Sequence, residues 1–188
     1  MPSIHAVTRL LAASVIGTAF ACASAFAAKT YEEPKEVGES TVVFVCNFGS
    51  MKSLLAAARF NELAKERGLP VRAVSRSADA QITHARVADS IAEGMAKDGY
   101  DVASFKPKPL TREEATKAAY IVHVTQETLA NDVGTPTASH RKDVEHWEGV
   151  ASGAKSYTAM RDGLLPRVDA FFETYTKKLQ KDPSVAAR

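Results

Sequence analysis

The sequence predicts an α/β fold, a three-layer α/β/α sandwich in which helices cover both faces of a four-stranded parallel sheet. Short runs of apolar and β-branched residues alternate along the chain with amphipathic segments of helical length. That alternation is typical of parallel strands joined by crossover helices. The first run, residues 41–46, is apolar almost throughout, as expected of a strand that is buried on both faces. The chain length suits one such domain.

Four runs have the length and the residue types of buried strands. They are residues 41–46, 71–74, 120–124 and 144–147. Three other segments carry apolar residues at intervals of three and four, the spacing of one helix face. They are residues 52–67, 85–99 and 157–179. Gly68 and Pro70 should end the first of these helices, and Pro166 should bend the last one or mark its start.

Shorter elements fill the remaining connections. Thr111 is a good N-cap for a short helix that ends near residue 118, because Glu114 stands where the capping box needs it. We expect a loop at residues 101–109, one helical turn at 127–131 and a loop at 134–142.

Residues 1–27 have the pattern of a bacterial signal peptide. Arg9 precedes an apolar run that ends in Ala25-Phe26-Ala27, a small-x-small signal for cleavage before Ala28. Retention of this run as an N-terminal anchor is the alternative. We expect residues 28–40 to be a flexible tail, residues 41–181 to be the domain and residues 182–188 to be a C-terminal tail. Cleavage would leave a periplasmic or secreted protein that does not associate with the membrane.

Charge and cysteine content exclude several classes of function. Lysine and arginine number 24 and aspartate and glutamate 22, and the two signs are interspersed. Without a basic stripe carrying aromatic residues, nucleic-acid binding has no support. The histidines and cysteines lack the spacing of a metal site, so we expect no metal and no cofactor. After cleavage only Cys46 remains, so an internal disulfide is excluded.

The most informative segment is residues 41–53, where an apolar strand ends in Cys46 and a helix starts at Lys52 and Ser53. A strand, a tight loop and a helix N-terminus together form an anion cradle, because the loop N–H groups and the helix dipole point at one spot. A thiol placed there is favoured as a thiolate nucleophile. Ligands of parallel sheets also bind at the carboxyl ends of strands. The alternative is a plain buried cysteine.

These residues resemble the low-molecular-weight protein tyrosine phosphatase superfamily, which includes arsenate reductases of the same fold. The loop of that family reads C-x5-R-[ST] after an apolar strand, and Cys46 to Ser53 fill it here. The similarity extends over nearly all of the expected mature chain. It includes the helix at residues 54–67, the sequence Ser75-Arg76-Ser77-Ala78, the sequence Lys108-Pro109-Leu110-Thr111 that is similar to the arsenate-reductase branch, Trp147, and the helix with Arg161 and Asp162.

The resemblance implies a role for each loop residue. Cys46 would be the nucleophile, Ser53 would stabilise its thiolate and Lys52 would contact the oxyanion. Gly49 lies where the family has a left-handed residue, a conformation that glycine adopts without strain. The backbone amides that would bind phosphate belong to Asn47, Phe48, Gly49, Ser50, Met51, Lys52 and Ser53.

Two departures from the family pattern weaken the predicted chemistry. Lys52 replaces an arginine, and an ammonium lacks the planar fork that binds two oxygens at once. The family's Asp-Pro acid after Trp147 is also missing. Both losses affect transition-state stabilisation rather than phosphate binding. Glu148, His146 and Asp143 are nearby candidates for the acid, and each is more simply a solvated loop residue.

Four side chains each have two possible interpretations. Lys52 is either an oxyanion contact or a first-turn lysine turned to solvent. Trp147 is either a wall of the pocket or a part of the core. Arg76 either supplies the missing guanidinium or is an exposed loop arginine. For Ser53, ordinary capping of the helix is the alternative to a contact with the thiolate.

Three functions follow from the sequence. The first is weak, cysteine-dependent hydrolysis of a phosphomonoester such as phosphotyrosine, through a phosphocysteine intermediate. The second is a non-catalytic module that binds an oxyanion or a phosphopeptide. The third is an arsenate reductase that uses an external thiol, since the expected mature chain has no other cysteine to relay electrons. The expected partners are phosphate, arsenate or another oxyanion, and a phosphorylated protein as substrate.

Overall fold

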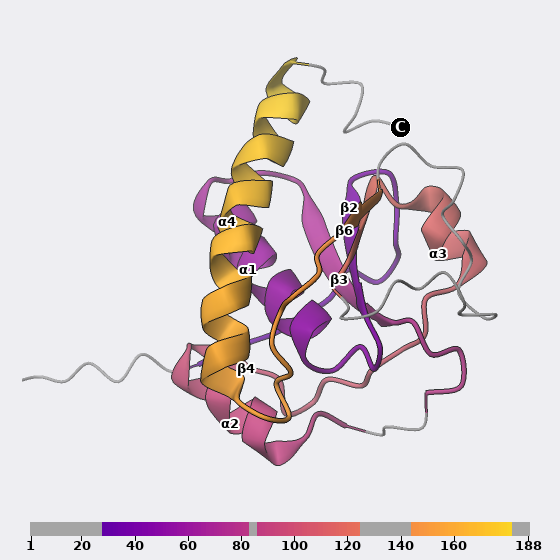
Figure 1. The fold of residues 1–188 in the computed structure, drawn as a ribbon. Coiled ribbons are helices and arrows are strands. Elements are labelled where there is room, and N and C mark those ends of the chain that lie inside the picture. Colours follow the sequence, from indigo (N-terminus) through magenta and orange to yellow (C-terminus); the bar gives the residue numbers. More distant parts are fainter. Residues whose placement is uncertain (1–27, 83–85, 125–143, 182–188) are drawn as a thin grey trace, which may run out of the picture.

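The computed structural model describes residues 28–82, 86–124 and 144–181 of the chain. Its centre is a four-stranded sheet with the strand order β3-β2-β5-β6, and every neighbouring pair is parallel (Figure 1). The strands are β2 (Thr41–Cys46), β3 (Arg72–Ser77), β5 (Tyr120–His123) and β6 (Val144–His146). The four predicted strands are therefore confirmed, with shifted ends.

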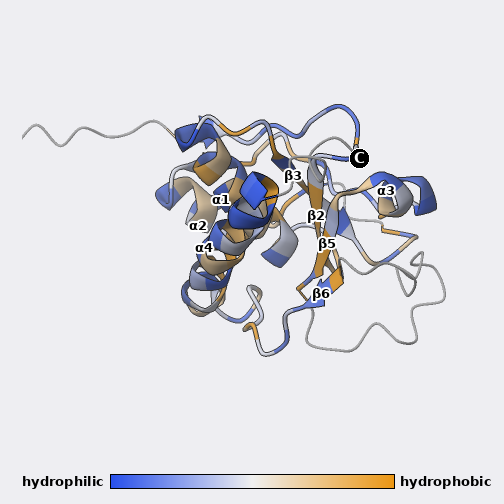
Figure 2. Cartoon of the chain, turned by 90° about the horizontal axis from the view of Figure 1, so that it is seen from above, coloured by the Kyte–Doolittle hydropathy of each residue, from blue (hydrophilic) through white to orange (hydrophobic). Residues whose placement is uncertain are grey.

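Helices lie on both faces of this sheet, so the predicted three-layer architecture is confirmed. Helices α1 (Lys52–Glu66) and α4 (Tyr157–Lys181) cover one face, and α3 (Arg112–Lys117) lies on the other (Figure 2). Helix α2 (Asp89–Lys97) packs beside the first turns of α4 at the end of the molecule where α1 begins (Figure 1). The capping box is present, because the Thr111 hydroxyl accepts from the Glu114 N–H and the Glu114 carboxylate accepts from the Thr111 N–H.

Aromatic side chains fill the space between the sheet and helices α1 and α4. Phe60 of α1 is fully buried and lies edge-to-face against Phe172 of α4, with ring centroids 5.0 Å apart. Phe44 of β2 contacts Phe60 at 6.0 Å and Phe171 at 6.0 Å. Burial of such large rings is the main source of stability for this layer. It also fixes β2 against α1.

Pro166 lies inside α4, which begins at Tyr157, so the alternative that Pro166 marks the start of the helix is wrong. Proline in a helix interior removes one backbone hydrogen bond and crowds the preceding turn. The buried face of the helix offsets that loss, since Leu164 and Val168 on either side of the proline are fully buried.

The predicted flexible tail is wrong for residues 29–37, which we call the N-terminal arm. Strand β1 (Lys29–Thr30) pairs in parallel with β4 (Tyr100–Asp101), which begins directly after the predicted helix at 85–99 and ends on the first residue of the predicted loop. Tyr31 is buried against the ring of Phe105 at 5.5 Å, and Val37 is buried in the core below α3. Two apolar side chains in a polar segment hold it to the domain. Their spacing shows no period, which is why the sequence pattern did not indicate an element.

Several predictions fall on residues that the structure does not describe. They are the leader at 1–27, the start of the second helix at 85, the helical turn at 127–131, the loop at 134–142 and the C-terminal tail at 182–188. In the ranges that the structure does describe, no helix has the length and apolarity needed to span a membrane.

His123 of β5 is a buried histidine on the α3 side of the sheet. It is 4% exposed, and its ring stacks on the ring of His146 at 4.9 Å. Its Nδ1 atom has no hydrogen-bond partner among the described residues. Burial, and secondarily the charge of His146, lowers the pKa of His123 to about 4. The folded protein therefore keeps this ring neutral at neutral pH.

The lowered pKa predicts an acid-sensitive fold. Between the unfolded-state pKa of about 6.5 and the folded value, only the unfolded chain protonates this ring, so the stability falls as the pH falls. We expect His123 to account for roughly 3 kcal/mol of lost unfolding free energy between pH 7.5 and pH 4. Urea unfolding of the wild type and of His123→Leu at both pH values measures this loss. The carboxylates contribute equally to the pH dependence of the two proteins, so the difference between them belongs to His123. An equal pH slope in the two proteins would contradict the prediction, and His146→Gln should keep most of the slope.

Candidate functional site

Cys46 is the last residue of β2, the strand that lies between β3 and β5. The register places Ser77 of β3 beside it, and Val124, directly after β5, donates its N–H to the Val45 carbonyl at 2.7 Å. The chain turns after Cys46 and enters α1 at Lys52. The predicted order of strand, tight loop and helix N-terminus is therefore what the structure has. It lies at the carboxyl edge of the sheet, where neighbouring strands have crossovers that run in opposite directions.

The loop between Cys46 and Lys52 is tied to the end of β3. The Ser77 hydroxyl donates to the Asn47 carbonyl at 2.6 Å, and the Ser75 hydroxyl lies 3.0 Å from the Gly49 carbonyl. Gly49 has φ of +63°, as the sequence predicted. A Cβ atom at Gly49 would lie 2.8 Å from the backbone nitrogen of Ser77, so the site also needs glycine for space.

The Cys46 sulfur has a serine partner. Its Sγ atom lies 3.0 Å from the Ser53 hydroxyl, and Ser53 is fully buried. The Ser75 hydroxyl in turn donates to the Ser53 oxygen at 2.8 Å. When Cys46 is a thiolate it can only accept, so Ser53 donates to it and Ser75 donates to Ser53. This chain of hydroxyls stabilises negative charge on the sulfur, because each bond polarises the next.

The N-terminus of α1 lies beside this sulfur and carries no side-chain cap. Met51 is the N-cap residue and makes no side-chain capping bond. Among the contacts of the described residues, none of the backbone N–H groups at positions 49–53 donates to another group of the chain. Unpaired N–H groups at a helix start are a binding site for an anion. The Ser53 side chain faces Cys46 rather than capping the helix, so its predicted contact with the sulfur is the correct interpretation.

Lys52 is turned inward, so the alternative of a lysine in solvent is wrong. The residue is 8% exposed, and its Nζ atom donates to the carbonyl of Val150 at 2.8 Å. Burial lowers the pKa of Lys52, while the nearby Cys46 acts in the opposite direction. An ammonium has three N–H groups, and Val150 takes one of them. The remaining donors and the positive charge are available to an oxyanion beside the sulfur.

A small pocket of about 100 Å³ opens above Cys46. Phe48, which is 39% exposed, and Met51 give it an apolar rim. The described residues that line it are Cys46, Asn47, Phe48, Met51, Lys52, Val124 and Ser152, and none of these is acidic.

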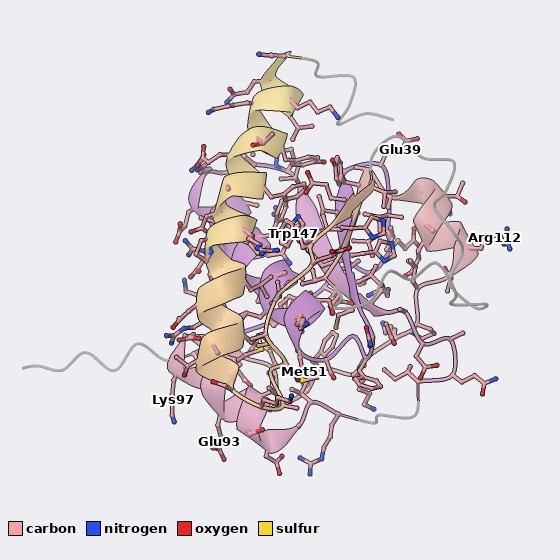
Figure 3. All side chains as sticks on the ribbon, in the orientation of Figure 1. Glu39, Met51, Glu93, Lys97, Arg112 and Trp147 are labelled. Atoms are coloured by element: carbon pink, nitrogen blue, oxygen red, sulfur yellow. The ribbon has the colours of Figure 1, made fainter. Side chains whose placement is uncertain are left out.

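Trp147 is a core residue rather than a wall of this pocket. Its ring packs against Phe44 and Phe171, both at 5.8 Å, and its Nε1 atom donates to Glu145. Figure 3 shows Trp147 between α4 and the sheet, well away from Met51 at the start of α1. The residue is absent from the pocket lining, so the pocket-wall interpretation is wrong.

Arg76 does not replace the missing guanidinium. It lies between Ser75 and Ser77 on β3, and alternate residues of a strand face opposite sides. Both serines face the Cys46 loop, so Arg76 faces away from it. Its guanidinium is buried between Glu33 at 2.8 Å and Glu114 at 2.7 Å. Neither predicted interpretation of Arg76, guanidinium donor or exposed loop residue, describes this ion pair.

The candidate acids near Trp147 do not reach the pocket. Glu148 and His146 are exposed and are absent from the pocket lining, and Asp143 lies outside the described residues. The segment after Trp147 instead contributes Ser152 to the lining and the Val150 carbonyl to Lys52. Nor do the described ranges contain a His, Cys, Asp or Glu group that could hold a metal ion.

Sequence reasoning missed Ser75 and Ser77 as parts of the site. Both are buried, and both bond to the loop through their hydroxyls. The sequence pattern that could have found them is Ser-Arg-Ser at the end of a strand, because alternate residues of a strand face the same side. The predicted strand ended at Val74, so this alternation was not extended to Ser75 and Ser77.

Comparison with known proteins identifies the same architecture. The family model described as "Low molecular weight phosphotyrosine protein phosphatase" matches residues 41–181. A search of curated proteins finds no match.

Solved structures with this fold include three informative examples. A low-molecular-weight protein tyrosine phosphatase from T. tengcongensis aligns with a TM-score of 0.59 and 18% identity, over 71% of this chain and 98% of that one. The YwlE arginine phosphatase from Geobacillus stearothermophilus aligns with a TM-score of 0.59 and 18% identity, over 76% of this chain and 96% of that one. An arsenate reductase in the phosphate-binding state aligns with a TM-score of 0.56 and 16% identity, over 71% of this chain and 97% of that one. At these identities the likeness shows the fold alone.

Proposed function

We propose, from the premise that this chain belongs to the low-molecular-weight phosphotyrosine protein phosphatase family, that it is a slow cysteine-dependent phosphatase acting on phosphomonoesters with good leaving groups. The observation that carries this proposal is the 3.0 Å contact between Cys46 Sγ and Ser53 Oγ at the uncapped start of α1, beside the buried Lys52. A thiolate, free helix N–H groups and a cation are what attack on a phosphoryl group requires.

The proposed reaction has two displacements at phosphorus. In the first, the Cys46 thiolate forms an S–P bond as the bond from phosphorus to the leaving oxygen breaks, and the leaving oxygen keeps the electron pair and takes a proton from water. In the second, water attacks the phosphocysteine, the S–P bond breaks, and inorganic phosphate leaves. The proton of the attacking water passes to solvent and the thiolate is restored. Backbone N–H groups at positions 49–53 and the Lys52 ammonium would hold the phosphoryl oxygens.

The pocket lining explains the restriction to good leaving groups. A general acid usually contributes about 10²–10⁴-fold in rate by protonating the leaving oxygen. The described lining carries Ser152 and no carboxylic acid. Since the described lining offers no acid, we propose substrates whose departing oxygen is stable as an anion, as in a phenol of low pKa or an acyl group. An alkyl phosphate would be a poor substrate.

A series of aryl phosphates tests this proposal on the purified full-length protein. We expect turnover of dinitrophenyl phosphate to exceed that of phenyl phosphate by about a hundredfold or more, the share that an acid would otherwise supply. Cys46→Ser is the control, since a serine hydroxyl is a far weaker nucleophile in this position. Equal background rates for wild type and Cys46→Ser on every ester would overturn the phosphatase proposal.

A non-catalytic oxyanion-binding module is the second candidate, and the bond from Lys52 to the Val150 carbonyl favours it. That bond holds the ammonium beside the sulfur without the fork that recognises a trigonal-bipyramidal phosphoryl group. Phosphate or vanadate binding with no turnover would support this function over hydrolysis.

Arsenite release that needs both an added thiol and Cys46 would instead assign the site to arsenate reduction.

A further inference from the structure

We propose that the N-terminal arm, residues 29–37, is a positioning element of the Cys46 site and acts through the contact of Glu33 with Ser75. The inference rests on the proposed function in one respect, that Cys46 is the reactive group. The arm precedes residues 41–181, the part that matches the family model. Its contacts are therefore argued from this structure.

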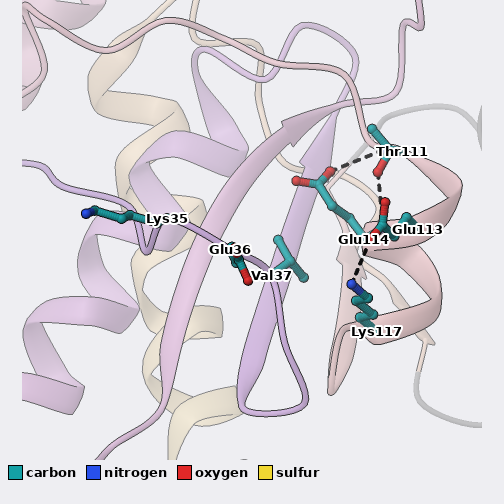
Figure 4. A pocket seen from close by; sticks show the side chains of 7 residues that line it. All are labelled: Lys35, Glu36, Val37, Thr111, Glu113, Glu114 and Lys117. Atoms are coloured by element: carbon teal, nitrogen blue, oxygen red, sulfur yellow. Dashed lines mark hydrogen bonds and ion pairs between the residues drawn. The ribbon is translucent and has the colours of Figure 1, made fainter.

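The arm is held to the domain at both ends. At its start, Lys29–Thr30 pairs with β4, and the next residue, Tyr31, is buried against Phe105. At its end, Val37 is buried among side chains that include Leu110 and Ala115. Figure 4 shows the arm running from Lys35 past Glu36 toward α3, with Val37 the nearest of the three to that helix. A pocket of about 350 Å³ is lined by this part of the arm and by side chains of Thr111 and α3.

Glu33 is the arm residue that reaches the sheet. Its Oε1 atom accepts from the Ser75 backbone N–H at 2.7 Å and from the Tyr31 hydroxyl at 3.1 Å. Its Oε2 atom accepts from the Arg76 guanidinium at 2.8 Å. Burial and the adjacent Glu33 raise the pKa of Tyr31 well above its usual range, so the tyrosine hydroxyl remains a donor. One carboxylate thus binds two consecutive residues of β3.

Ser75 connects that carboxylate to the reactive sulfur. Its backbone nitrogen is bonded to Glu33, and its hydroxyl is bonded to Ser53 at 2.8 Å and lies 3.0 Å from the Gly49 carbonyl. Ser53 contacts Cys46. Since the position of a side chain follows its backbone, Glu33 sets where the Ser75 hydroxyl lies. Loss of the Glu33 contact would loosen the hydroxyl chain that stabilises the thiolate.

A second link fixes the same strand from the α3 side. Glu114 of α3 binds the Arg76 guanidinium at 2.7 Å, opposite Glu33. The guanidinium therefore joins the arm, β3 and α3 in one ion-pair network. Without the Glu33 carboxylate, Arg76 keeps Glu114 and the Ser75 carbonyl as acceptors, whereas the Ser75 N–H loses its acceptor. The loss therefore reaches the Cys46 site through Ser75.

Alkylation of Cys46 by iodoacetamide tests the proposal on the full-length chain, because it measures the thiolate without any need for turnover. Modification is followed at the Cys46 peptide by mass spectrometry, which separates it from Cys22. We expect Glu33→Gln to slow alkylation at pH 7 by about tenfold, because the neutral amide makes a weaker bond to the Ser75 N–H and no longer pairs with Arg76. Glu32→Gln, an exposed neighbour on the same arm, is the matched control and should leave the rate unchanged.

A double-mutant cycle with Ser75→Ala separates positioning from a merely structural role. Without the Ser75 hydroxyl, Glu33→Gln should still lower the urea midpoint but should no longer change the alkylation rate. Equal slowing by Glu33→Gln in both backgrounds, or an unchanged rate in the wild-type background, would overturn the arm proposal. Either result is independent of the aryl phosphate series, so failure of the arm proposal is distinguishable from failure of the phosphatase proposal.

Discussion

Replacing Lys52 with arginine is expected to raise the turnover of dinitrophenyl phosphate by about a hundredfold, the lower end of what one well-placed oxyanion donor contributes. A guanidinium offers two parallel N–H groups to the equatorial oxygens of the transition state, and the ammonium of Lys52 offers single donors. One of these already goes to the Val150 carbonyl. A guanidinium has five N–H groups, so it can keep that bond and still bind the phosphoryl group.

Lys52→Met is the matched control, because it keeps the length of the buried stem and removes the charge. Its turnover should fall below the wild-type value. The pH dependence adds a second readout. Since burial lowers the pKa of Lys52, wild-type activity should decline on the alkaline side before an ordinary lysine would lose its proton, and the arginine variant should not show this decline. Turnover in Lys52→Arg at or below the wild-type rate, with the fold intact, would count against an oxyanion role for this position.

Gly49→Ala is expected to abolish phosphate binding and to lower the unfolding free energy by about 2 kcal/mol or more. The φ of +63° is strained for alanine, and the added Cβ atom would lie 2.8 Å from the Ser77 nitrogen. The loop must then move away from β3. That movement breaks the contacts that set the direction of the N–H groups at positions 49–53.

Gly68→Ala separates the two causes of this effect. Gly68 has φ of +62°, with no atom within 4 Å of the position of an added Cβ. It should therefore show only the cost of the left-handed backbone, about 1 kcal/mol, and should leave activity unchanged. Urea unfolding and the phosphate dependence of Cys46 alkylation measure both variants. Equal effects of the two substitutions would contradict the close-approach argument.

The elements predicted best from the sequence are those that apolar spacing alone determines. The run at residues 41–46 and the spacing around Phe60 gave β2 and α1, and their junction gave the Cys46 loop. The left-handed Gly49 was implied by the family resemblance rather than by local spacing. Thr111 and Glu114 gave the start of α3, because a capping box depends on two residues only. Local chemistry was sufficient for each of these elements.

The errors fall where a distant partner decides the outcome. β3 continues through Ser75, Arg76 and Ser77, polar residues that the sequence placed in a loop. They are buried because Glu33, some 40 residues earlier, and the Cys46 loop supply their hydrogen bonds. Lys52 is similar, since its acceptor Val150 lies 98 positions away. No local pattern specifies contacts of that range.

The outer side of β3 has a consequence for the solubility of the protein. As the terminal strand of the sheet, β3 would leave a row of N–H and C=O groups unpaired, and such a row can add strands from other molecules and lead to aggregates. Here Asn61 binds both backbone groups of Ala73, Glu33 accepts the Ser75 N–H, and Lys108 accepts the Ser77 N–H. A shortened chain that begins at residue 41 would lose the Glu33 cover, so recombinant expression should keep the residues before the matched region.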